Sequence, residues 1–461
     1  MKFLLTVLLS LFILGAKAQS SLNMNLLYQW KDTTLIKSVI GSTYNEVWGH
    51  EQNGREYAII GSTVGTHIFD VTDVNNVDSV AFIPGKLQST QVVHRDYDTY
   101  QNYLYMVCDE GPSSLQIADL SYLPDSVPLV YDESTVINTS HNIFIDTAAG
   151  YLYTCGGATT AWVNYLSVYS LSADPLNPQL VINCNIDVPF WSSTIGYVHD
   201  IYVKNDTGYC NAGPAGLFVV DFSDMNNVQS IGSLTSYAQQ GYNHSGWLHS
   251  SGNYYAFADE TAGKDVKIVD VTNFSNITLI DTIGSNVDQN NSMPHNVIFK
   301  GDLLYVSFYE DGLYVFNTSD PNNIFVEGYY DTSLMPYHLA GGNWGVYPFL
   351  PSGKILASDE QEGLLVFETF FSIGVEKYDQ EKNIELIVYP NPSTGFVNID
   401  LNKVESPESY TVVDVKGSVL ETGMLTREQL RIDMNKFDQG VYLIYINQTN
   451  GNRISKKIII N

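Results

Sequence analysis

The sequence predicts an all-β protein, with a seven-bladed β-propeller followed by a small C-terminal β-sandwich, and three observations support this fold class. The chain of 461 residues is rich in strand and turn formers, with 32 Tyr and 35 Gly. A segment with room for four short strands recurs along most of the chain. The last part has a separate pattern of alternating strands and turns marked by Pro and Gly.

The first element is a predicted secretory signal peptide over residues 1–18. Lys2 precedes an apolar run from Phe3 to Leu14, and small residues at Ala16 and Ala18 provide a cleavage site before Gln19. The run is too short for a spanning helix, and no later apolar stretch reaches about 18 residues. We therefore expect cleavage between Ala18 and Gln19 and an exported mature chain without a transmembrane segment.

The second element, residues 19–371, contains the repeat. Each copy has a His, an alternating strand, a turn, a second strand, a Gly and a phrase similar to LVVD-T-D-x-N-N, as at residues 216–224. Four-stranded units at this period are typical of β-propeller blades. An array of two-sheet sandwiches is the alternative. The copies begin at His50, His94, His141, His199, His244, His295 and His338.

The ring of blades is expected to close through the N-terminus. The seventh copy ends near Phe371 without a fourth strand, while residues 25–30 form an orphan strand before the first copy. Pairing this strand with the last blade removes an exposed sheet edge.

The repeated phrases, in register over about residues 25–371, resemble the LVIVD repeats of the choice-of-anchor B family of bacterial secreted proteins. This resemblance implies a secreted repeat protein and supplies no biochemical activity.

The C-terminal element, residues 384–461, follows a charged linker at residues 372–383 and is expected to be a small sandwich. It resembles the type A C-terminal sorting domain of the type IX secretion system of Bacteroidetes. The resemblance implies a partner in the type IX secretion machinery, and a destination at the outer-membrane surface or outside the cell. A sandwich that binds carbohydrate is the alternative. The residues that carry the resemblance are Tyr389, Pro390, Asn391, Pro392, Gly395, Gly417, Gly440, Tyr442, Lys456 and Lys457.

The composition excludes some partners. The formal net charge of -28 is incompatible with neutralising the phosphates of a nucleic acid, and it also disfavours an anionic membrane surface. Most of the acidic excess lies between residues 19 and 383, where it either attracts cations or serves solubility. The four cysteines either pair as disulfides or remain buried thiols, and they are Cys108, Cys155, Cys184 and Cys210.

The repeat predicts one candidate site. In an antiparallel hairpin the start of the first strand and the end of the second lie together, so the repeated His and the acids after them should share one channel mouth. No cofactor is certain, but such a set suits a divalent metal (Ca, Zn or Mn) or acid/base chemistry. Alternatively, the His residues bond one blade to the next and the acids belong to turns. The candidates are His94, His141, His199, His244, His295, His338, Asp109, Glu110, Asp259, Glu260, Glu310 and Asp359.

No sequence motif supports nucleophilic catalysis or nucleotide binding. We therefore expect a non-catalytic module that binds an unknown protein or glycan, with a metal-dependent hydrolase or lyase at the channel mouth as the alternative. Trp48, Trp247 and Trp344 either stack on a sugar or pack in the core.

Overall fold

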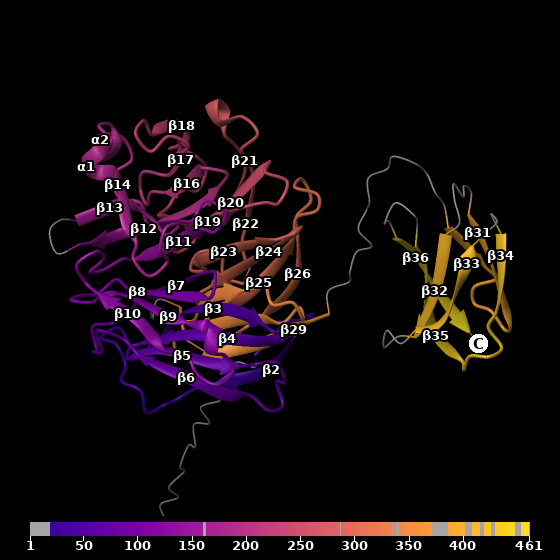
Figure 1. The fold of residues 1–461 in the computed structure, drawn as a ribbon. Coiled ribbons are helices and arrows are strands. Elements are labelled where there is room, and N and C mark those ends of the chain that lie inside the picture. Colours follow the sequence, from indigo (N-terminus) through magenta and orange to yellow (C-terminus); the bar gives the residue numbers. More distant parts are fainter. Residues whose placement is uncertain are drawn as a thin grey trace, which may run out of the picture. The chain divides into compact units, whose positions relative to one another are not determined.

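The first unit of the structure is a ring of seven antiparallel sheets around a common centre (Figure 1). In this computed structural model the described residues are 19–159, 163–285, 287–333, 335–337, 341–370, 386–401, 408–414, 419–425, 429–447 and 453–460. The predicted signal peptide with Ala18, the predicted linker at residues 372–383, His338 and Gly417 lie outside the described residues. The chain divides into two units, Met1–Phe370 and Phe371–Asn461.

Each blade follows the order of its strands in the chain. Blade 1 comprises β3 (Tyr44–Gln52), β4 (Arg55–Ser62), β5 (Gly65–Asp70) and β6 (Asp78–Pro84). Blade 2 comprises β7 (Arg95–Tyr100), β8 (Tyr103–Cys108), β9 (Leu115–Asp119) and β10 (Leu129–Glu133), with the 3-10 turn η1 (Leu120–Tyr122). Blade 3 comprises β11 (Asn142–Asp146), β12 (Tyr151–Ala158), β13 (Val163–Ser170) and β14 (Gln179–Asn183).

The second half of the ring has the same organisation. Blade 4 comprises β15 (Asp200–Lys204), β16 (Thr207–Asn211), β17 (Leu217–Asp221) and β18 (Gln229–Leu234). Blade 5 comprises β19 (Asn243–Leu248), β20 (Tyr254–Asp259), β21 (Val266–Asp270) and β22 (Thr278–Ile283), with η2 (Phe274–Asn276). Blade 6 comprises β23 (Pro294–Lys300), β24 (Leu303–Phe308), β25 (Gly312–Asn317), β26 (Phe325–Tyr330) and β1 (Ser21–Leu22). Blade 7 comprises β27 (Asn343–Tyr347), β28 (Ile355–Asp359), β29 (Gly363–Thr369) and β2 (Met24–Trp30).

The first strand of every blade is the innermost one. β3, β7, β11, β15, β19, β23 and β27 contact one another in sequence, and β27 contacts β3. These strands therefore line a central channel, and the predicted seven-bladed propeller is confirmed. The alternative of a sandwich array is wrong.

The middle strands are apolar because neighbouring blades cover both of their faces. β4 is buried at every residue except Arg55, whereas the outer strand β10 has only exposed and half-buried residues. Strands buried on both faces appear in a sequence as continuous apolar runs. This is the origin of the apolar half of the repeated phrase.

The polar half of the repeated phrase forms a turn. Oδ1 of Asp73 accepts a hydrogen bond from the backbone N–H of Asn75 at 3.0 Å. Asp224 and Asp320 accept the same bond, also at 3.0 Å, from the residue two positions further on. Such Asx turns let a short polar side chain replace a backbone acceptor. The phrase therefore links the third strand of a blade to its fourth.

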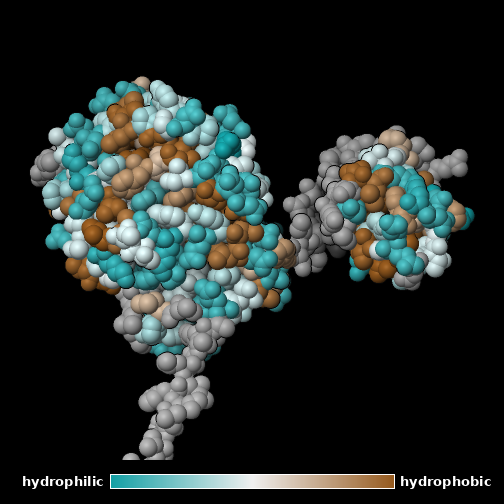
Figure 2. All heavy atoms as spheres, turned by 90° about the horizontal axis from the view of Figure 1, so that it is seen from below, coloured by the Kyte–Doolittle hydropathy of each residue, from teal (hydrophilic) through white to brown (hydrophobic). Residues whose placement is uncertain are grey.

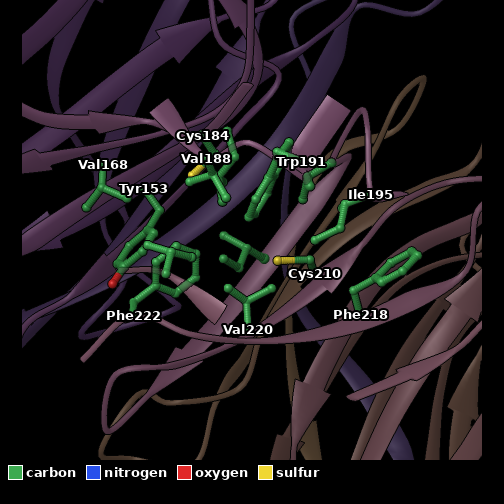
Figure 3. Close-up of a cluster of buried hydrophobic side chains, with 14 of the residues drawn as sticks. Tyr153, Val168, Cys184, Val188, Trp191, Ile195, Cys210, Phe218, Val220 and Phe222 are labelled. Carbon is green, nitrogen blue, oxygen red and sulfur yellow. The ribbon is translucent and has the colours of Figure 1, made fainter. Parts of the chain in front are cut away.

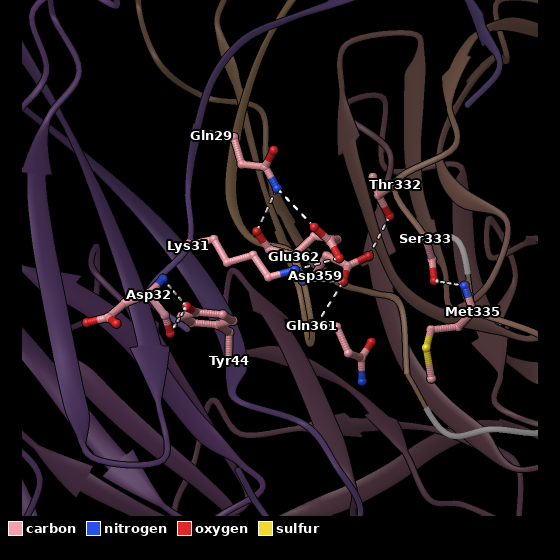
Figure 4. Close-up of polar contacts among 10 residues, drawn as sticks. All are labelled: Gln29, Lys31, Asp32, Tyr44, Thr332, Ser333, Met335, Asp359, Gln361 and Glu362. Atoms are coloured by element: carbon pink, nitrogen blue, oxygen red, sulfur yellow. Dashed lines mark hydrogen bonds and ion pairs between the residues drawn. The ribbon is translucent and has the colours of Figure 1, made fainter. Parts of the chain in front are cut away.

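The N-terminal segment closes the ring. β2 pairs with β29, with Met24 opposite Thr369 and Trp30 opposite Leu364, so the expected closure is confirmed. The segment also adds β1 to the outer edge of blade 6. Figure 4 shows the contacts that follow β2, where Lys31 forms an ion pair with Glu362 at 2.7 Å.

A helical insertion fills the junction of blades 3 and 4. α1 (Cys184–Asp187) and α2 (Trp191–Thr194) lie between β14 and β15. Trp191 is fully buried in a cluster with side chains from both blades (Figure 3). All four cysteines are buried free thiols, and the cluster includes Cys155, Cys184 and Cys210.

The second unit contains two antiparallel sheets. One comprises β30 (Leu386–Tyr389), β31 (Phe396–Leu401) and β34 (Gln429–Asp433). The other comprises β32 (Glu408–Asp414), β33 (Val419–Leu425), β35 (Gly440–Asn447) and β36 (Arg453–Ile460). Val397, Val412 and Ile444 are fully buried in one shared core, so this unit is a small β-sandwich as expected.

Asn391 of the predicted sorting segment holds the last strand of this sandwich. Its Nδ2 donates to the carbonyl of Lys457 at 2.6 Å, and its Oδ1 accepts the N–H of Ile459 at 2.9 Å. Tyr442 donates its hydroxyl hydrogen to the carbonyl of Asp438 at 2.6 Å. Two residues of the predicted motif, Asn391 and Tyr442, therefore have structural partners within the sandwich.

The surface is mixed in hydropathy on the side that Figure 2 shows, where hydrophobic residues alternate with hydrophilic ones. Large exposed apolar side chains occur on many elements, including Val39, Tyr122, Val163 and Ile186. The distinctive chemistry lies in the channel.

Candidate functional site

Five imidazoles and one indole form a ring at one mouth of the channel, which we call the His ring. Each side chain stands at the start of an innermost strand. The centroids of neighbouring rings are 4.1, 4.1, 4.0, 4.4 and 4.3 Å apart, and the last pair closes the circle at 5.4 Å. The members in order are His94, His141, His199, His244, His295 and Trp344.

In blades 1 and 7 the ring position at the start of the innermost strand is occupied by a residue other than histidine. His50 is near the far end of β3, where its Nε2 lies 3.5 Å from Oε1 of Gln52, so its assignment as an opening residue is wrong. Asn45 stands at the equivalent position of blade 1, one residue after the start of β3. Trp344 takes that position in blade 7. The prediction for His338 is untested.

Hydrogen bonds orient three of the imidazoles. Nδ1 of His199 donates to the carbonyl of His244 at 3.1 Å, and Nδ1 of His295 donates to the carbonyl of Trp344 at 2.7 Å. Both bonds join neighbouring blades, as one of the two interpretations of the repeat requires. Nδ1 of His141 bonds Oδ2 of Asp109 at 3.0 Å. These bonds assign the proton of the three imidazoles to Nδ1, so Nε2 of each keeps its lone pair.

Four of the five imidazoles are uncharged at neutral pH. Burial, together with repulsion from neighbouring imidazoles, lowers the pKa of His94, His199 and His244 well below the usual value. Burial lowers the pKa of His295 to about 3. A neutral imidazole can donate a nitrogen lone pair to a metal ion, so the same burial that makes these residues poor cations makes them available ligands.

Two of the predicted acids lie beside the ring in blade 2. Asp109 bonds His141, as described above. Oε2 of Glu110 accepts the backbone N–H of His94 at 3.3 Å, and burial raises the pKa of its carboxyl. The expected meeting of His and acid at one mouth is therefore present in this blade.

Two further acids are occupied elsewhere. Asp259 forms a fully buried ion pair with Lys267 at 2.9 Å and accepts a hydrogen bond from the hydroxyl of Tyr237, also at 2.9 Å. Asp359 accepts hydrogen bonds from the N–H groups of Gln361 and Glu362 and so caps a turn. The alternative interpretation, that some of these acids are structural, holds for both.

Glu260 is the acid that joins the ring. Its Oε2 lies 3.6 Å from Nε2 of His244, and its Oε1 accepts the hydroxyl hydrogen of Tyr309 at 2.6 Å. Burial raises the pKa of its carboxyl. Glu310 is buried in the same region.

Glu360 was not among the predicted site residues, although it directly follows Asp359. It is 1% exposed, and neither carboxylate oxygen accepts a hydrogen bond of normal geometry from the described residues. The side chain of Ser42 acts to lower the pKa of this carboxyl. Burial, then repulsion from Asp359, Glu260 and Glu310, raises the pKa of Glu360 to about 8. This mouth therefore holds a buried carboxyl group that forms no ion pair with a described residue.

Two groups of side chains have metal-binding geometry. His141, His199 and His244 form one, and His244, Glu260 and His295 form the other. In each group the three ligand atoms lie within 4.8 Å of one another.

A second layer of the channel is acidic. In five blades the residue that follows the ring position is polar and lines a cavity between the innermost strands, and in blade 2 the residue two positions after His94, Asp96, does so. Burial raises the pKa of Glu46 to about 7 and that of Asp200 to about 6, and it raises the pKa of Asp96 well above its usual value. Gly345 has no side chain here because a Cβ would lie 1.9 Å from Oε1 of Glu46.

A third layer is aromatic, about 10 Å further along the channel because a strand rises about 3.3 Å per residue. Its side chains come three residues after the ring position, as in Trp48, Tyr202 and Trp247. Phe349 adds one more, 36% exposed. Neighbouring ring centroids are 5.3, 4.8, 5.8, 5.5 and 5.0 Å apart. This aromatic arc contains, in order, Phe144, Tyr202, Trp247, Phe349, Tyr347 and Trp48.

Asp98 occupies the aromatic layer in blade 2 and lines the same cavity. Its oxygens accept the N–H groups of Thr99 and Ile145, both at 2.6 Å, and burial raises the pKa of its carboxyl to about 7. From the sequence, Trp48 and Trp247 of this layer are candidates for stacking on a ligand, but Asp98 and the other aromatic members are not predicted. An offset of three residues from the ring position predicts the members that the strands β3, β11, β15, β19 and β27 contribute, whereas Asp98 comes four residues after His94.

The comparisons identify the second unit. Residues 387–461 match the family model of the secretion system C-terminal sorting domain. The protein is therefore exported by type IX secretion, to the cell surface or the extracellular space. No helix in the described part of the chain is long and apolar enough to cross a membrane. The type A assignment, the signal peptide and the choice-of-anchor B resemblance stay predictions.

Solved structures resemble the chain at the level of the fold. The β-propeller domain of Cps50 (Swd1) from Myceliophteria thermophila gives a TM-score of 0.50 at 10% identity, covering 75% of this chain and 99% of that one. PorZ, an essential bacterial surface component of the type IX secretion system of Porphyromonas gingivalis, gives 0.45 at 11% identity and covers 94% of this chain. The chain spans 61% of the PorZ chain.

A functionally unknown protein from Desulfotomaculum acetoxidans gives a TM-score of 0.45 at 15% identity, covering 71% of this chain and 93% of that one. No curated protein matches the sequence.

Proposed function

We propose that the protein is an exported, non-catalytic binding module whose aromatic arc receives a basic side chain, Lys or Arg, of a protein partner. The observation that carries this proposal is a set of four buried carboxyl groups facing the channel cavity with no cation beside them. In the described part of the chain, no Lys or Arg pairs with any of them within 4.0 Å. The four are Glu46, Asp96, Asp98 and Asp200.

Electrostatics favours a cationic ligand at this place. The pKa values of these carboxyls are raised because burial opposes their ionisation, and Glu46, Asp96 and Asp200 also repel one another. An ammonium or guanidinium group in the cavity would stabilise the ionised forms. The acidity of the whole chain, with a net charge of -28, would also attract a basic partner.

The aromatic arc suits the stem and the head of such a side chain. Cations are attracted to the faces of Trp and Tyr rings, and alkyl stems pack against the same faces. Aromatic rings also stack on sugars, which was the glycan alternative. The acidic layer beneath the arc is the reason to favour a basic protein side chain over a neutral glycan.

The test is a pair of acetylated and amidated pentapeptides, Gly-Gly-Lys-Gly-Gly and the same peptide with norleucine for lysine. Binding to the full chain is followed by calorimetry and tryptophan fluorescence. We expect the lysine peptide to bind and the norleucine peptide to fail. Glu46→Gln and Trp247→Leu should each weaken binding about tenfold, which corresponds to about 1.4 kcal/mol.

The matched control is Glu133→Gln, on the exposed outer strand β10. Equal binding of the two peptides, or unchanged binding in both channel variants, would rule out the proposal. Stoichiometric binding of neutral oligosaccharides with no response to the lysine peptide would establish the glycan alternative instead.

One observation favours the second candidate function, a metal-dependent hydrolase or lyase: the metal-binding geometry of His244, Glu260 and His295. Against it, both imidazoles are almost enclosed, at 3% and 2% exposure. We expect no turnover of ester, peptide or glycoside substrates by the zinc-supplemented protein. Turnover that disappears in Glu260→Gln would replace the binding function with this one.

A further inference from the structure

The His ring contains a group of donors that the proposed binding function does not use. His244 lies in β19 of blade 5, Glu260 lies in the loop that follows β20 of the same blade, and His295 lies in β23 of blade 6. Their three ligand atoms lie within 4.8 Å of one another. They stand at the ring mouth, and the aromatic arc stands at the opposite end of the channel.

The hydrogen bonds around these residues select the donor atoms. Nδ1 of His295 is bonded to the carbonyl of Trp344 at 2.7 Å, so its Nε2 holds the lone pair. Oε1 of Glu260 is bonded to the hydroxyl of Tyr309 at 2.6 Å, which leaves Oε2 facing His244. Such second-shell bonds orient metal ligands in proteins.

The spacing is close to that of a coordinated ion. Nε2 of His244 and Oε2 of Glu260 are 3.6 Å apart. Two ligands of a tetrahedral zinc ion, each about 2.0 to 2.1 Å from the metal, lie about 3.4 Å from each other. This pair therefore needs only a small adjustment, and the third donor, on His295, lies within 4.8 Å of both.

An independent feature points to a missing positive charge at the same place. Glu360 is 1% exposed, and neither of its oxygens has a hydrogen bond of normal geometry from a described residue. It interacts electrostatically with Glu260 and with Glu310. A divalent cation bound by Glu260 would offset this concentration of buried carboxyl groups.

We propose that His244, Glu260 and His295 bind one Zn²⁺ ion, with water as the fourth ligand. Two imidazole nitrogens and one carboxylate oxygen are a donor set that suits zinc. Ca²⁺ requires six to eight oxygen ligands, so this group does not suit it. The ion would join blade 5 to blade 6.

The competing group, His141, His199 and His244, shares one ligand with the proposed site. Its three neutral imidazoles would leave both charges of the ion uncompensated in a buried setting. Glu260 removes one of these charges, and this is the reason for assigning the ion to the group that contains it.

The experiment uses the full chain without a His tag. The protein is stripped with a chelator, dialysed, and then incubated with zinc. Zinc content is determined by inductively coupled plasma mass spectrometry, and affinity by competition with a zinc indicator dye. We expect one equivalent of zinc per chain. Glu260→Gln and His295→Gln should each weaken the affinity by at least tenfold, as loss of a ligand requires.

Two histidine variants serve as controls. His249→Gln changes a histidine outside the ring, which pairs with Asp302 at 3.2 Å, and should leave zinc binding unchanged. His141→Gln should change the affinity by less than twofold, because His141 belongs only to the competing group. Near-UV circular dichroism establishes that each variant is folded.

X-ray absorption at the zinc edge of the wild-type protein tests the assignment without any substitution. A first shell of nitrogen and oxygen donors, with the outer-shell scattering of two imidazoles, supports the proposal. A shell with three imidazoles, loss of binding in His141→Gln, or a folded wild-type chain without stoichiometric zinc would each overturn it. These results do not depend on the lysine-peptide assay, so the two proposals fail separately.

Discussion

Replacement of Glu46 by Gln should stabilise the propeller at alkaline pH relative to the wild type. Burial raises the pKa of this carboxyl from 4.5 to about 7. The folded state therefore holds the proton more tightly than the unfolded state. The contribution to stability is fully present below pH 4.5, and it is lost as the pH rises through about 7.

The size of the effect follows from the pKa difference. One pKa unit corresponds to about 1.4 kcal/mol, so between pH 5 and pH 8 this carboxyl should remove about 2 kcal/mol from the free energy of unfolding. Gln does not titrate, and its shape is nearly that of Glu. Nδ2 of Asn296 now donates to Oε2 of Glu46 at 2.8 Å. A turn of the Asn296 amide would let its oxygen accept from the new Gln instead.

The assay is reversible urea unfolding of both proteins at pH 5 and pH 8, followed by tryptophan fluorescence. All 6 Trp precede residue 371, so the signal reports on the propeller alone. The stability of Glu46→Gln relative to the wild type should rise by about 2 kcal/mol between the two pH values. A difference between variant and wild type that is the same at both pH values would refute the reasoning.

Further expected outcomes concern the other parts of the molecule. Trp191→Ala should lower the free energy of unfolding by about 3 to 5 kcal/mol, measured by urea unfolding, since it empties a fully buried site between blades 3 and 4. Asn391→Ala should reduce export in a secretion assay and lower the melting temperature of the isolated sandwich, because two hydrogen bonds to the last strand are lost. Zinc at about 100 times its dissociation constant should stabilise the propeller by about 2.7 kcal/mol, seen as a higher melting temperature that Glu260→Gln abolishes. The lysine peptide should bind more tightly at pH 8 than at pH 5.5, since the raised pKa values of Glu46 and Asp98 keep these carboxyls protonated at the lower pH; calorimetry at both pH values would show an unchanged affinity if the carboxyls were not involved.

The architecture could be predicted because it is repeated in the chain. The period and the apolar third strand recur along the chain, and the Asp-x-Asn turn recurs in three copies. The strand that ends at Trp30 could be predicted because it is left over once the other strands are assigned to copies. β1 was not predicted, because Ser21 and Leu22 are too few to form a pattern. The spacing of 58 residues between His141 and His199 was unexplained until α1 and α2 were placed in it.

The site was harder to predict because one residue type was used to align the repeats. His50 happens to lie near the end of β3, whereas the true ring position of that blade is Asn45. Consecutive acids of one blade also have different partners. Asp259 is paired with Lys267 on the neighbouring strand β21, but Glu260 faces His244, and only the pairing of strands distinguishes these roles.

The ring closure also determines how the propeller would resist a pulling force. The residues that lead to the sorting domain follow β29, so tension on that domain acts first on this strand. β29 is not at an edge, since it lies between β2 and β28 and is hydrogen-bonded to both. Extracting it requires two ladders to break together, one of which is formed by the opposite end of the chain. The strand that closes the ring therefore also serves as a mechanical lock on the point where the exported chain would be held.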